Sequence, residues 1–124
     1  MPKVLLIDDD ASLREVVAFA LREYGHEVDA HSSGESALGK LDSFRPDVVI
    51  TDLKMPGIDG MEVLRRVNEA DPTIPVIMLT AFGSITDAVE AMRRGAYDYM
   101  TKPYDRDELR LTLEQALERR RLLL

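Results

Sequence analysis

The chain has no cysteine and no tryptophan, and aromatic residues make up only 6% of its 124 positions. Without cysteine it can form no disulfide framework, no thiolate zinc site and no thiol nucleophile. No apolar run approaches the roughly 20 residues that a membrane-spanning helix needs. The N-terminal stretch MPKVLLI leads into three acids instead of a cleavage site for a secretion signal. These absences favour a cytoplasmic protein that does not contact a membrane.

Positive charge is also scarce. Lys and Arg number 16 against 23 Asp and Glu, which gives a net charge of -7 and a pI near 4.8. Direct binding of nucleic acid draws on a basic face that neutralises phosphates. The one basic cluster, 119–121, falls near the end of a predicted helix, where cations complement the helix dipole. The composition therefore predicts no direct contact with nucleic acid.

The apolar runs predict an α/β fold. KVLLI, PDVVIT and PVIMLT lack polar alternation, as is typical of buried parallel strands, and the shorter segments 26–31 and 97–100 complete a set of five. Helical patterns alternate with these strands. Residues 1–124 are thus predicted to form one domain, a (βα)5 doubly wound sheet of five parallel strands with helices on both faces, in three layers.

Helix starts are indicated by a side-chain acceptor three residues before an acid, because this pair satisfies the free amides of a first turn. The acceptors in this pattern are Ser12, Ser32, Asp59, Ser84 and Asp105. Asp10 is an alternative cap for the first helix. Gly25 and Gly95 follow helical segments, where a left-handed C-cap is expected.

In sheets of this kind the functional site lies at the carboxyl ends of the strands. The residues found there are Asp8, Asp9 and Asp10 after the first strand, Asp52 after the third, Thr80 at the end of the fourth and Lys102 after the fifth. Several carboxylates in one pocket repel each other unless one is protonated or a hard divalent cation binds among them. We therefore expect Asp8 and Asp9 to bind Mg²⁺, and Asp10 to cap the first helix.

Asp52 is the best candidate for a nucleophile. A carboxylate can attack phosphorus to form an aspartyl phosphate, provided that counter-charges stabilise the transferring oxygens. Lys102 would supply a cation and Thr80 a hydroxyl hydrogen bond. Each residue also has a simpler interpretation, as a solvated strand-end acid, a loop lysine or an ordinary strand threonine. Their joint placement favours phosphate chemistry.

Together, the motifs LLIDDD, DLKMPGIDG, LTAFGS and GAYDYMTKPYD resemble the receiver domains of two-component response regulators over essentially the whole chain. The resemblance implies a flavodoxin-like, CheY-like fold with Asp52 as the phosphoacceptor. It further implies that Mg²⁺, or Mn²⁺ in its place, is held by Asp8, Asp9, Asp52 and the backbone carbonyl of Lys54, while Lys102 and Thr80 contact the phosphoryl group.

The same resemblance implies a signalling role in which the donor is a phosphohistidine on a partner sensor histidine kinase. The domain would catalyse only transfer to its own aspartate and later hydrolysis, so it is not otherwise an enzyme. Thr80 and Tyr99 would form a switch pair, and the Lys102–Pro103 bond would be cis. The output face would comprise the helix after Ser84, the strand 97–100 and the helix 105–124.

The segment AFGSITDAVEAMRRGAYDYMTKP resembles the NtrC-type subgroup, whose receivers precede an AAA+ ATPase and a DNA-binding domain in activators of sigma-54 polymerase. The helix 105–124 ends on three leucines without a capping glycine, and Leu117 and Leu124 are seven positions apart. We therefore expect this helix to run into the linker of a longer protein, and the protein to form a homodimer in one phosphorylation state.

Three other functions compete with this interpretation. A phosphatase of the haloacid-dehalogenase type needs a second acid two residues after the nucleophile, where this chain has Lys54. A flavodoxin-like nucleotide or flavin module needs a Gly- or hydroxyl-rich loop after the first strand, where this chain has DDDAS. A stand-alone receiver, or a receiver-like scaffold that works without phosphorylation, stays open as the alternative.

Overall fold

The computed structural model describes residues 1–81 and 83–124, so Phe82 of the LTAFGS motif lies outside the described part. The strands are β1 (Lys3–Ile7), β2 (Glu27–His31), β3 (Val48–Thr51), β4 (Val76–Thr80) and β5 (Asp98–Thr101). The helices are α1 (Ala11–Glu23), α2 (Gly34–Leu38), α3 (Leu41–Phe44), α4 (Gly60–Ala70), α5 (Ile85–Arg93) and α6 (Arg106–Leu123). None of these described helices is long and apolar enough to span a membrane.

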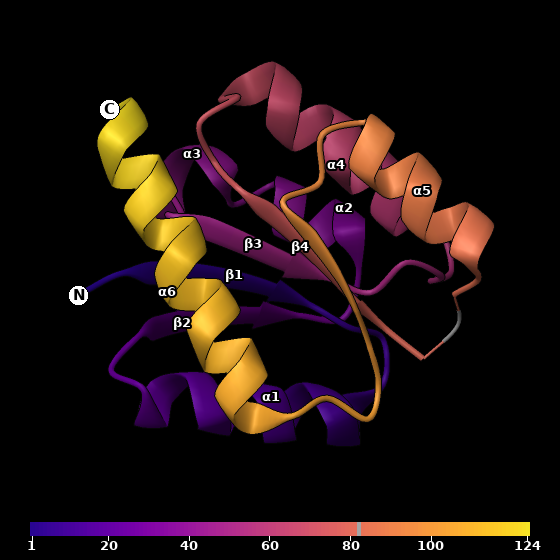
Figure 1. Ribbon diagram of the computed structural model, residues 1–124, viewed down its shortest axis with the longest axis horizontal. Coiled ribbons are helices and arrows are strands. Elements are labelled where there is room, and N and C mark those ends of the chain that lie inside the picture. Colours follow the sequence, from indigo (N-terminus) through magenta and orange to yellow (C-terminus); the bar gives the residue numbers. More distant parts are fainter. Residues whose placement is uncertain (82) are drawn as a thin grey trace.

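The five strands form one parallel sheet in the order β2-β1-β3-β4-β5, and Figure 1 labels β1 to β4 within it. The predicted doubly wound sheet is therefore confirmed. The two weakest strand predictions are each displaced by one residue at their start, since β2 begins at Glu27 and β5 at Asp98. The chain reverses its direction of winding between β1 and β3, and the crevice at the carboxyl ends of these two strands is where such sheets bind ligands.

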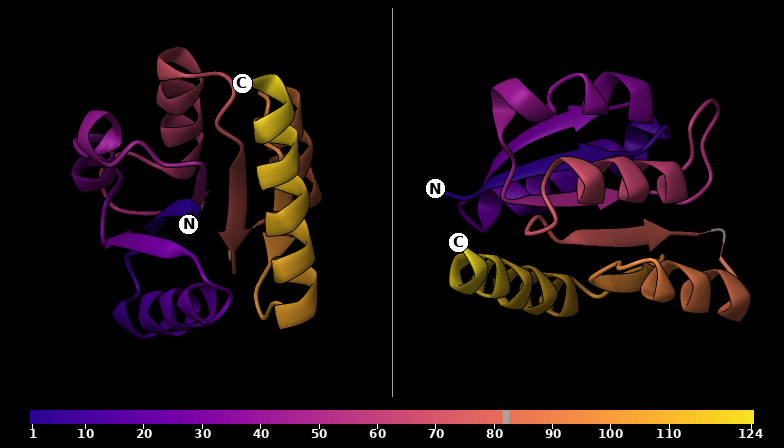
Figure 2. Two further views of the ribbon diagram at one scale, coloured as in Figure 1. Left: turned by 90° about the vertical axis from the view of Figure 1, so that its left-hand side faces the viewer. Right: turned by 90° about the horizontal axis from the view of Figure 1, so that it is seen from above.

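Helices cover both faces of the sheet, so the predicted three layers are also confirmed (Figure 2). Alternate residues of β1 separate the two cores, with Val4 and Leu6 on one face and Leu5 and Ile7 on the other. The first core is completed by α1 and α6, and the second by α2, α4 and α5. Because both faces are buried, β1, β3 and β4 read as continuous apolar runs in the sequence.

The helix starts agree with the predicted caps at four positions and differ at one. Asp59, Ser84 and Asp105 accept hydrogen bonds from first-turn amides of α4, α5 and α6. The first helix is capped by Asp10, as expected, and not by the alternative Ser12, whereas α2 is capped by Ser33 and not by Ser32. Adjacent hydroxyl and carboxyl residues offer the same chemistry, and only the backbone path decides which one has extended dihedrals at the cap.

The two glycine C-caps are confirmed, with φ of 93° at Gly25 and 101° at Gly95. One feature was not predicted: the second helical region divides at Gly39 and Lys40 into the short helices α2 and α3. The described part of the chain therefore contains five strands but six helices.

Asp71 links the C-terminal helix α6 to the loop between α4 and β4, at the end of the strands opposite the predicted site. It follows α4 and accepts hydrogen bonds from the amide (2.9 Å) and hydroxyl (2.6 Å) of Thr73. Arg120 of α6 lies 3.5 Å from its other oxygen. The hydroxyl of Thr73 holds the pKa of Asp71 below its ordinary value of 3.8; burial opposes this, while the Thr73 amide and Arg120 add to it.

This depressed pKa predicts an acid-sensitive contribution to stability. The contribution is present above the ordinary pKa and is lost as the pH falls through the lowered one. Since the Asp71 side chain is 38% exposed, solvent screening limits the cost of Asp71→Asn at pH 7 to about 0.5–1 kcal/mol. We expect the difference from wild type in urea-unfolding free energy to shrink as the pH falls below the ordinary value of 3.8 and to vanish below the lowered pKa. A difference that grew on acidification would contradict this assignment.

Candidate functional site

The sheet brings Asp8 and Asp52 together because β1 and β3 are neighbours. The backbone amide of Asp52 donates to the carbonyl of Ile7 at 3.0 Å, and the amide of Asp8 donates to that of His31 at 3.1 Å. Both aspartates thus continue the ladder at the switch point by one residue beyond the regular strands. The flanking strands are buried except for Lys3 at the start of β1, which makes the backbone beneath the two carboxylates rigid.

Lys102 lies between these two carboxylates. Its ammonium donates to Asp8 Oδ2 at 2.6 Å and to Asp52 Oδ2 at 3.3 Å. The side chains of the three residues are at most 8% exposed. The backbone amide of Lys102 donates to the carbonyl of Thr80 at 3.0 Å, so β4 fixes the base of the lysine. Residues 50 and 94 positions apart thereby form one charged cluster.

The charge on Lys102 is stabilised by its partners. Burial disfavours the ammonium form, but the hydrogen bond to Asp8 and the negative charges of Asp52 and Asp8 outweigh this penalty, and the pKa of Lys102 lies above its ordinary value. The cluster therefore holds a permanent cation beside the predicted nucleophile. A cation at this place can also neutralise oxygens of a phosphoryl group.

Asp9 adds a third carboxylate. One oxygen from each of Asp8, Asp9 and Asp52 lies within 4.8 Å of the others, and Asp9 faces solvent while the other two are buried. The donors are all hard carboxylate oxygens, and Lys102 balances only one of their three charges. This donor set fits Mg²⁺, which binds one or two carboxylates and keeps several waters. Lys54 follows Asp52 by two residues on the exposed loop, and the role of its carbonyl stays a prediction.

The carboxylate of Asp52 is oriented from two sides. Its Oδ1 accepts from the amide of Leu53 at 2.7 Å, while Oδ2 faces Lys102. The carboxylate of Asp8 is held similarly, since Oδ1 accepts from the amide of Asp10 at 3.0 Å and Oδ2 from Lys102. Each carboxylate is thus directed by one backbone donor and by the shared ammonium.

Thr80 and Tyr99 lie on β4 and β5, which are neighbouring strands of the sheet. Thr80 is completely buried at the end of β4. Tyr99, on β5, packs against the second core. The Lys102–Pro103 peptide bond that follows β5 is cis, as the resemblance predicts. The pKa of Tyr99 is raised by burial and, after that, by the negative charges of Asp87 and Asp52.

Two supporting residues escaped the sequence predictions. The guanidinium of Arg14 on α1 donates to the backbone carbonyl of Asp8 at 2.7 Å, although Arg14 reads as an ordinary helix cation. At Gly60, a Cβ atom would lie 2.4 Å from the backbone oxygen of Asp52, so only glycine lets α4 begin this close to Asp52. Gly60 directly follows a capping aspartate, so the sequence pattern indicated only a helix start and not the close approach to Asp52.

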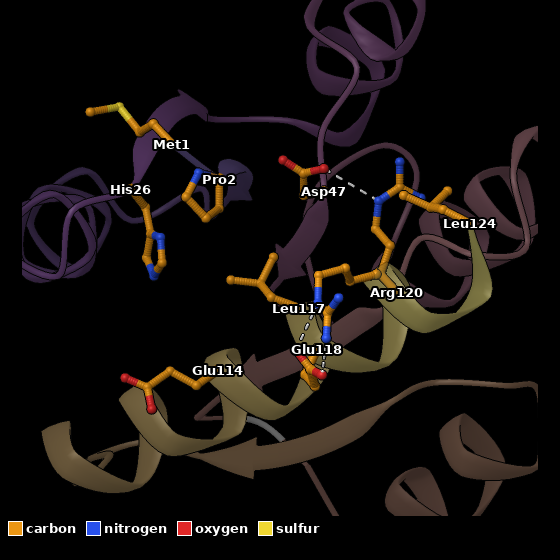
Figure 3. A pocket seen from close by; sticks show the side chains of 10 residues that line it. Met1, Pro2, His26, Asp47, Glu114, Leu117, Glu118, Arg120 and Leu124 are labelled. Atoms are coloured by element: carbon orange, nitrogen blue, oxygen red, sulfur yellow. Dashed lines mark hydrogen bonds and ion pairs between the residues drawn. The ribbon is translucent and has the colours of Figure 1, made fainter.

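A surface pocket of about 520 Å³ lies away from this cluster (Figure 3). Pro2, His26 and Asp47, which precede β1, β2 and β3, line one side of it, and α6 lines the other. In Figure 3, Arg120 pairs with Asp47 across its rim. The pocket is therefore at the amino ends of the strands, opposite the carboxylates, and has no part in their chemistry.

Comparison with known proteins finds the same family that the sequence motifs resemble. Residues 4–114 match the family model described as response regulator receiver domain. The C4-dicarboxylate transport transcriptional regulatory protein DctD of Pseudomonas aeruginosa is 44% identical over 126 residues, covering 98% of this chain and 26% of that protein. The DNA-binding transcriptional regulator NtrC of Salmonella typhimurium is 39% identical over 114 residues, covering 92% of this chain and 24% of that protein.

Solved structures agree. A response regulator receiver domain protein from Clostridium thermocellum superposes with a TM-score of 0.95 at 36% identity, covering 100% of both chains. This chain spans less than half the length of curated relatives that it matches, and all of the length of that solved domain.

Proposed function

Since the chain belongs to the response regulator receiver domain family, we propose that it is a phosphoacceptor that takes a phosphoryl group on Asp52 from the phosphohistidine of a sensor histidine kinase. The observation that carries this proposal is the cluster in which Lys102 lies between Asp8 and Asp52, at the switch point of the sheet. A nucleophilic carboxylate, a cation and a set of metal donors within one site are the parts that phosphoryl transfer needs.

The transfer itself is a displacement at phosphorus. A carboxylate oxygen of Asp52 forms the new O–P bond, the N–P bond to the donor imidazole breaks, and its electron pair stays on that imidazole. Lys102 would neutralise an oxygen of the phosphoryl group, and Thr80 would donate a hydroxyl hydrogen bond to another. Mg²⁺, bound by Asp8, Asp9 and Asp52, would supply further neutralisation of the phosphoryl oxygens.

Return to the resting state reverses the modification by a different route. A water oxygen attacks phosphorus, the bond between phosphorus and the Asp52 oxygen breaks, and inorganic phosphate leaves with the carboxylate restored. The chain thus acts as substrate and catalyst for its own phosphorylation and has no separate substrate.

The output follows from a change of conformation. The phosphorylated side chain of Asp52 would carry about 1.5 to 2 negative charges in place of the single charge of the free carboxylate. This charge would favour the conformer in which Thr80 and Tyr99 respond to it, and would alter the face formed by α5, β5 and α6. Exposed apolar residues on this face, Ile85, Val89 and Met92 of α5 and Leu111 of α6, suit a homodimer in one phosphorylation state.

The identity of the relatives extends the proposal to transcription. Because NtrC and DctD are transcriptional regulators of which this chain matches about a quarter, we expect the domain to control an AAA+ ATPase and DNA-binding region of a sigma-54 activator in the cytoplasm. With its net charge of -7 the domain itself would not bind DNA. Helix α6, which ends at Leu123, would lead into the linker.

Removal of the metal provides the first test. On incubation with acetyl phosphate and Mg²⁺, intact-mass spectrometry of the chain should show the gain of one phosphoryl group. With EDTA in place of Mg²⁺ the gain should disappear, because the carboxylates would repel the incoming phosphate. Hydroxylamine, which attacks the carbonyl carbon of acyl phosphates, should release inorganic phosphate and leave the hydroxamate of Asp52 in place of the phosphorylated side chain.

The control is a direct measurement of metal binding by the same preparation. Uptake that persisted in EDTA would refute the Mg²⁺ site. Absence of uptake by folded chain that binds Mg²⁺ would refute self-catalysed transfer and support the phosphorylation-independent scaffold.

A further inference from the structure

The ring of Tyr99 lies directly against the backbone of Gly83, in the segment that leads from β4 to α5. A Cβ atom built on Gly83 would stand 1.6 Å from the Tyr99 hydroxyl oxygen, 2.7 Å from Cζ and 3.1 Å from Cε1. Ordinary contacts of a Cβ atom are 3.4–4 Å. The hydroxyl end of Tyr99 therefore occupies the space that any side chain at residue 83 would need.

The backbone at Gly83 does not itself require glycine. Its φ lies outside the left-handed region, whereas Gly25, Gly57 and Gly95 have positive φ. An alanine could therefore adopt this backbone conformation. Among the described residues, the ring of Tyr99 supplies all three of the nearest atoms that would clash with it. The conflict is thus specific to one pair of residues.

Tyr99 gains no hydrogen bond in this position. Its hydroxyl oxygen is buried and has no partner among residues 1–81 and 83–124. A buried hydroxyl without a partner is costly, so the position depends on packing and on space. The raised pKa of Tyr99, caused first by burial and then by the charges of Asp87 and Asp52, agrees with a hydroxyl shielded from water.

We propose that the absence of a side chain at residue 83 leaves the space in which the Tyr99 ring packs, and that the size of the residue at 83 thereby sets which orientation the ring adopts. Gly83 is a positioning residue in this scheme, since it acts only through Tyr99. Any larger residue would exclude the inward orientation and turn the ring toward solvent, beside the exposed apolar residues of α5.

This inference deepens the proposed function in one respect and rests on it there. If Tyr99 reports phosphorylation of Asp52 to the face of α5, β5 and α6, then Gly83→Ala would separate uptake of the phosphoryl group from the response of that face. The three atoms nearest to a Cβ on Gly83 all belong to Tyr99 and none to Asp8, Asp52 or Lys102, so uptake itself should be unchanged.

The decisive measurement is the position of the ring in the 124-residue chain. In wild type, NMR should show nuclear Overhauser contacts between the Tyr99 ring protons and the α protons of Gly83. In Gly83→Ala these contacts should be lost, and Tyr99 should be nitrated faster by tetranitromethane. Gly39→Ala is the matched control, because Gly39 has a φ of -64° and no neighbour closer than 3.4 Å to an added Cβ. It should leave the Tyr99 contacts unchanged.

A double-mutant cycle excludes a general effect of alanine on this segment. Gly83→Ala should lower the midpoint of thermal unfolding in the wild-type background, and should have no effect in a Tyr99→Ala background. If Gly83→Ala does not fold, the double variant should fold, because the clashing ring is gone. Persistence of the inward ring beside alanine, or equal destabilisation in both backgrounds, would overturn the proposal.

Phosphoryl uptake from acetyl phosphate separates the two levels. Both wild type and Gly83→Ala should take up the phosphoryl group. If the change in mobility or in dimerisation on phosphorylation is then lost only in the variant, the result supports both the packing of Tyr99 against Gly83 and its link to output. Absence of uptake in wild type would refute the proposed function, while the NMR contacts would still decide the role of Gly83.

Discussion

Asp52→Asn should abolish phosphoryl uptake from acetyl phosphate, with no gain in mass under conditions in which wild type is modified. Asparagine has nearly the same shape, and its Oδ1 can still accept from the amide of Leu53. Its amide lacks the anionic oxygen that attacks phosphorus, so the loss is expected to be complete and not partial. Intact-mass spectrometry, with peptide mapping after trapping of the aspartyl phosphate by reduction, measures both the extent and the place of modification.

Asp10→Asn is the matched control for this variant. Asp10 lies two residues from Asp8, but its side chain caps α1 by accepting from Leu13 at 3.1 Å. Asparagine caps a helix as well as aspartate does. The control removes the same charge near the same site and should keep wild-type uptake. Modification of Asp52→Asn, or loss of uptake in Asp10→Asn, would assign the nucleophile to another residue.

Lys102→Met should have the largest effect on stability. The substitution keeps a long side chain but leaves the buried carboxylates of Asp8 and Asp52 facing each other without a cation. Removing one partner of a buried ion pair costs about 3 kcal/mol or more. We expect the free energy of unfolding in urea to fall by about this amount in Mg²⁺-free buffer at pH 7, and Mg²⁺ to recover part of it by taking the place of the ammonium.

The pH dependence gives this prediction its sign. The raised pKa of Lys102 means that its contribution is fully present below its ordinary value of 10.5 and is lost as the pH rises through the higher value in the folded protein. Wild type should therefore approach Lys102→Met at strongly alkaline pH. Lys54→Met, which removes an equal charge from an exposed side chain, serves as the control. Equal losses in both variants would show that the buried cluster adds nothing to stability.

Local patterns in the sequence were sufficient for the elements and for the types of residue at the site. Continuous apolar runs identified β1, β3 and β4 because both faces of these strands are buried, and hydrophobic periodicity is a property of neighbouring residues. Alternation of strands and helices then determined a parallel sheet, since right-handed crossovers leave few other arrangements. The carboxyl ends of those strands selected Asp8, Asp52 and Lys102 before any distance was known.

The edge strands and the caps were less predictable. β2 is only partly buried, so its polar residues weaken the apolar signal and its start was displaced by one residue. Ser32 and Ser33, like Asp10 and Ser12, offer similar capping chemistry within one or two positions. The backbone dihedrals that choose between them depend on where the preceding strand ends in the sheet.

The sequence by itself therefore determined an α/β fold, its five strands and the types of side chain at their carboxyl ends, because these follow from periodicity and residue chemistry. Only the tertiary structure decided that the Lys102 ammonium lies between two carboxylates. It also decided that the backbone of Asp52 leaves no room for a side chain at Gly60, and that the ring of Tyr99 fills the space beside Gly83. Contacts of this kind join residues far apart in the chain. They depend on strand order, register and side-chain rotamer together, which no local pattern encodes.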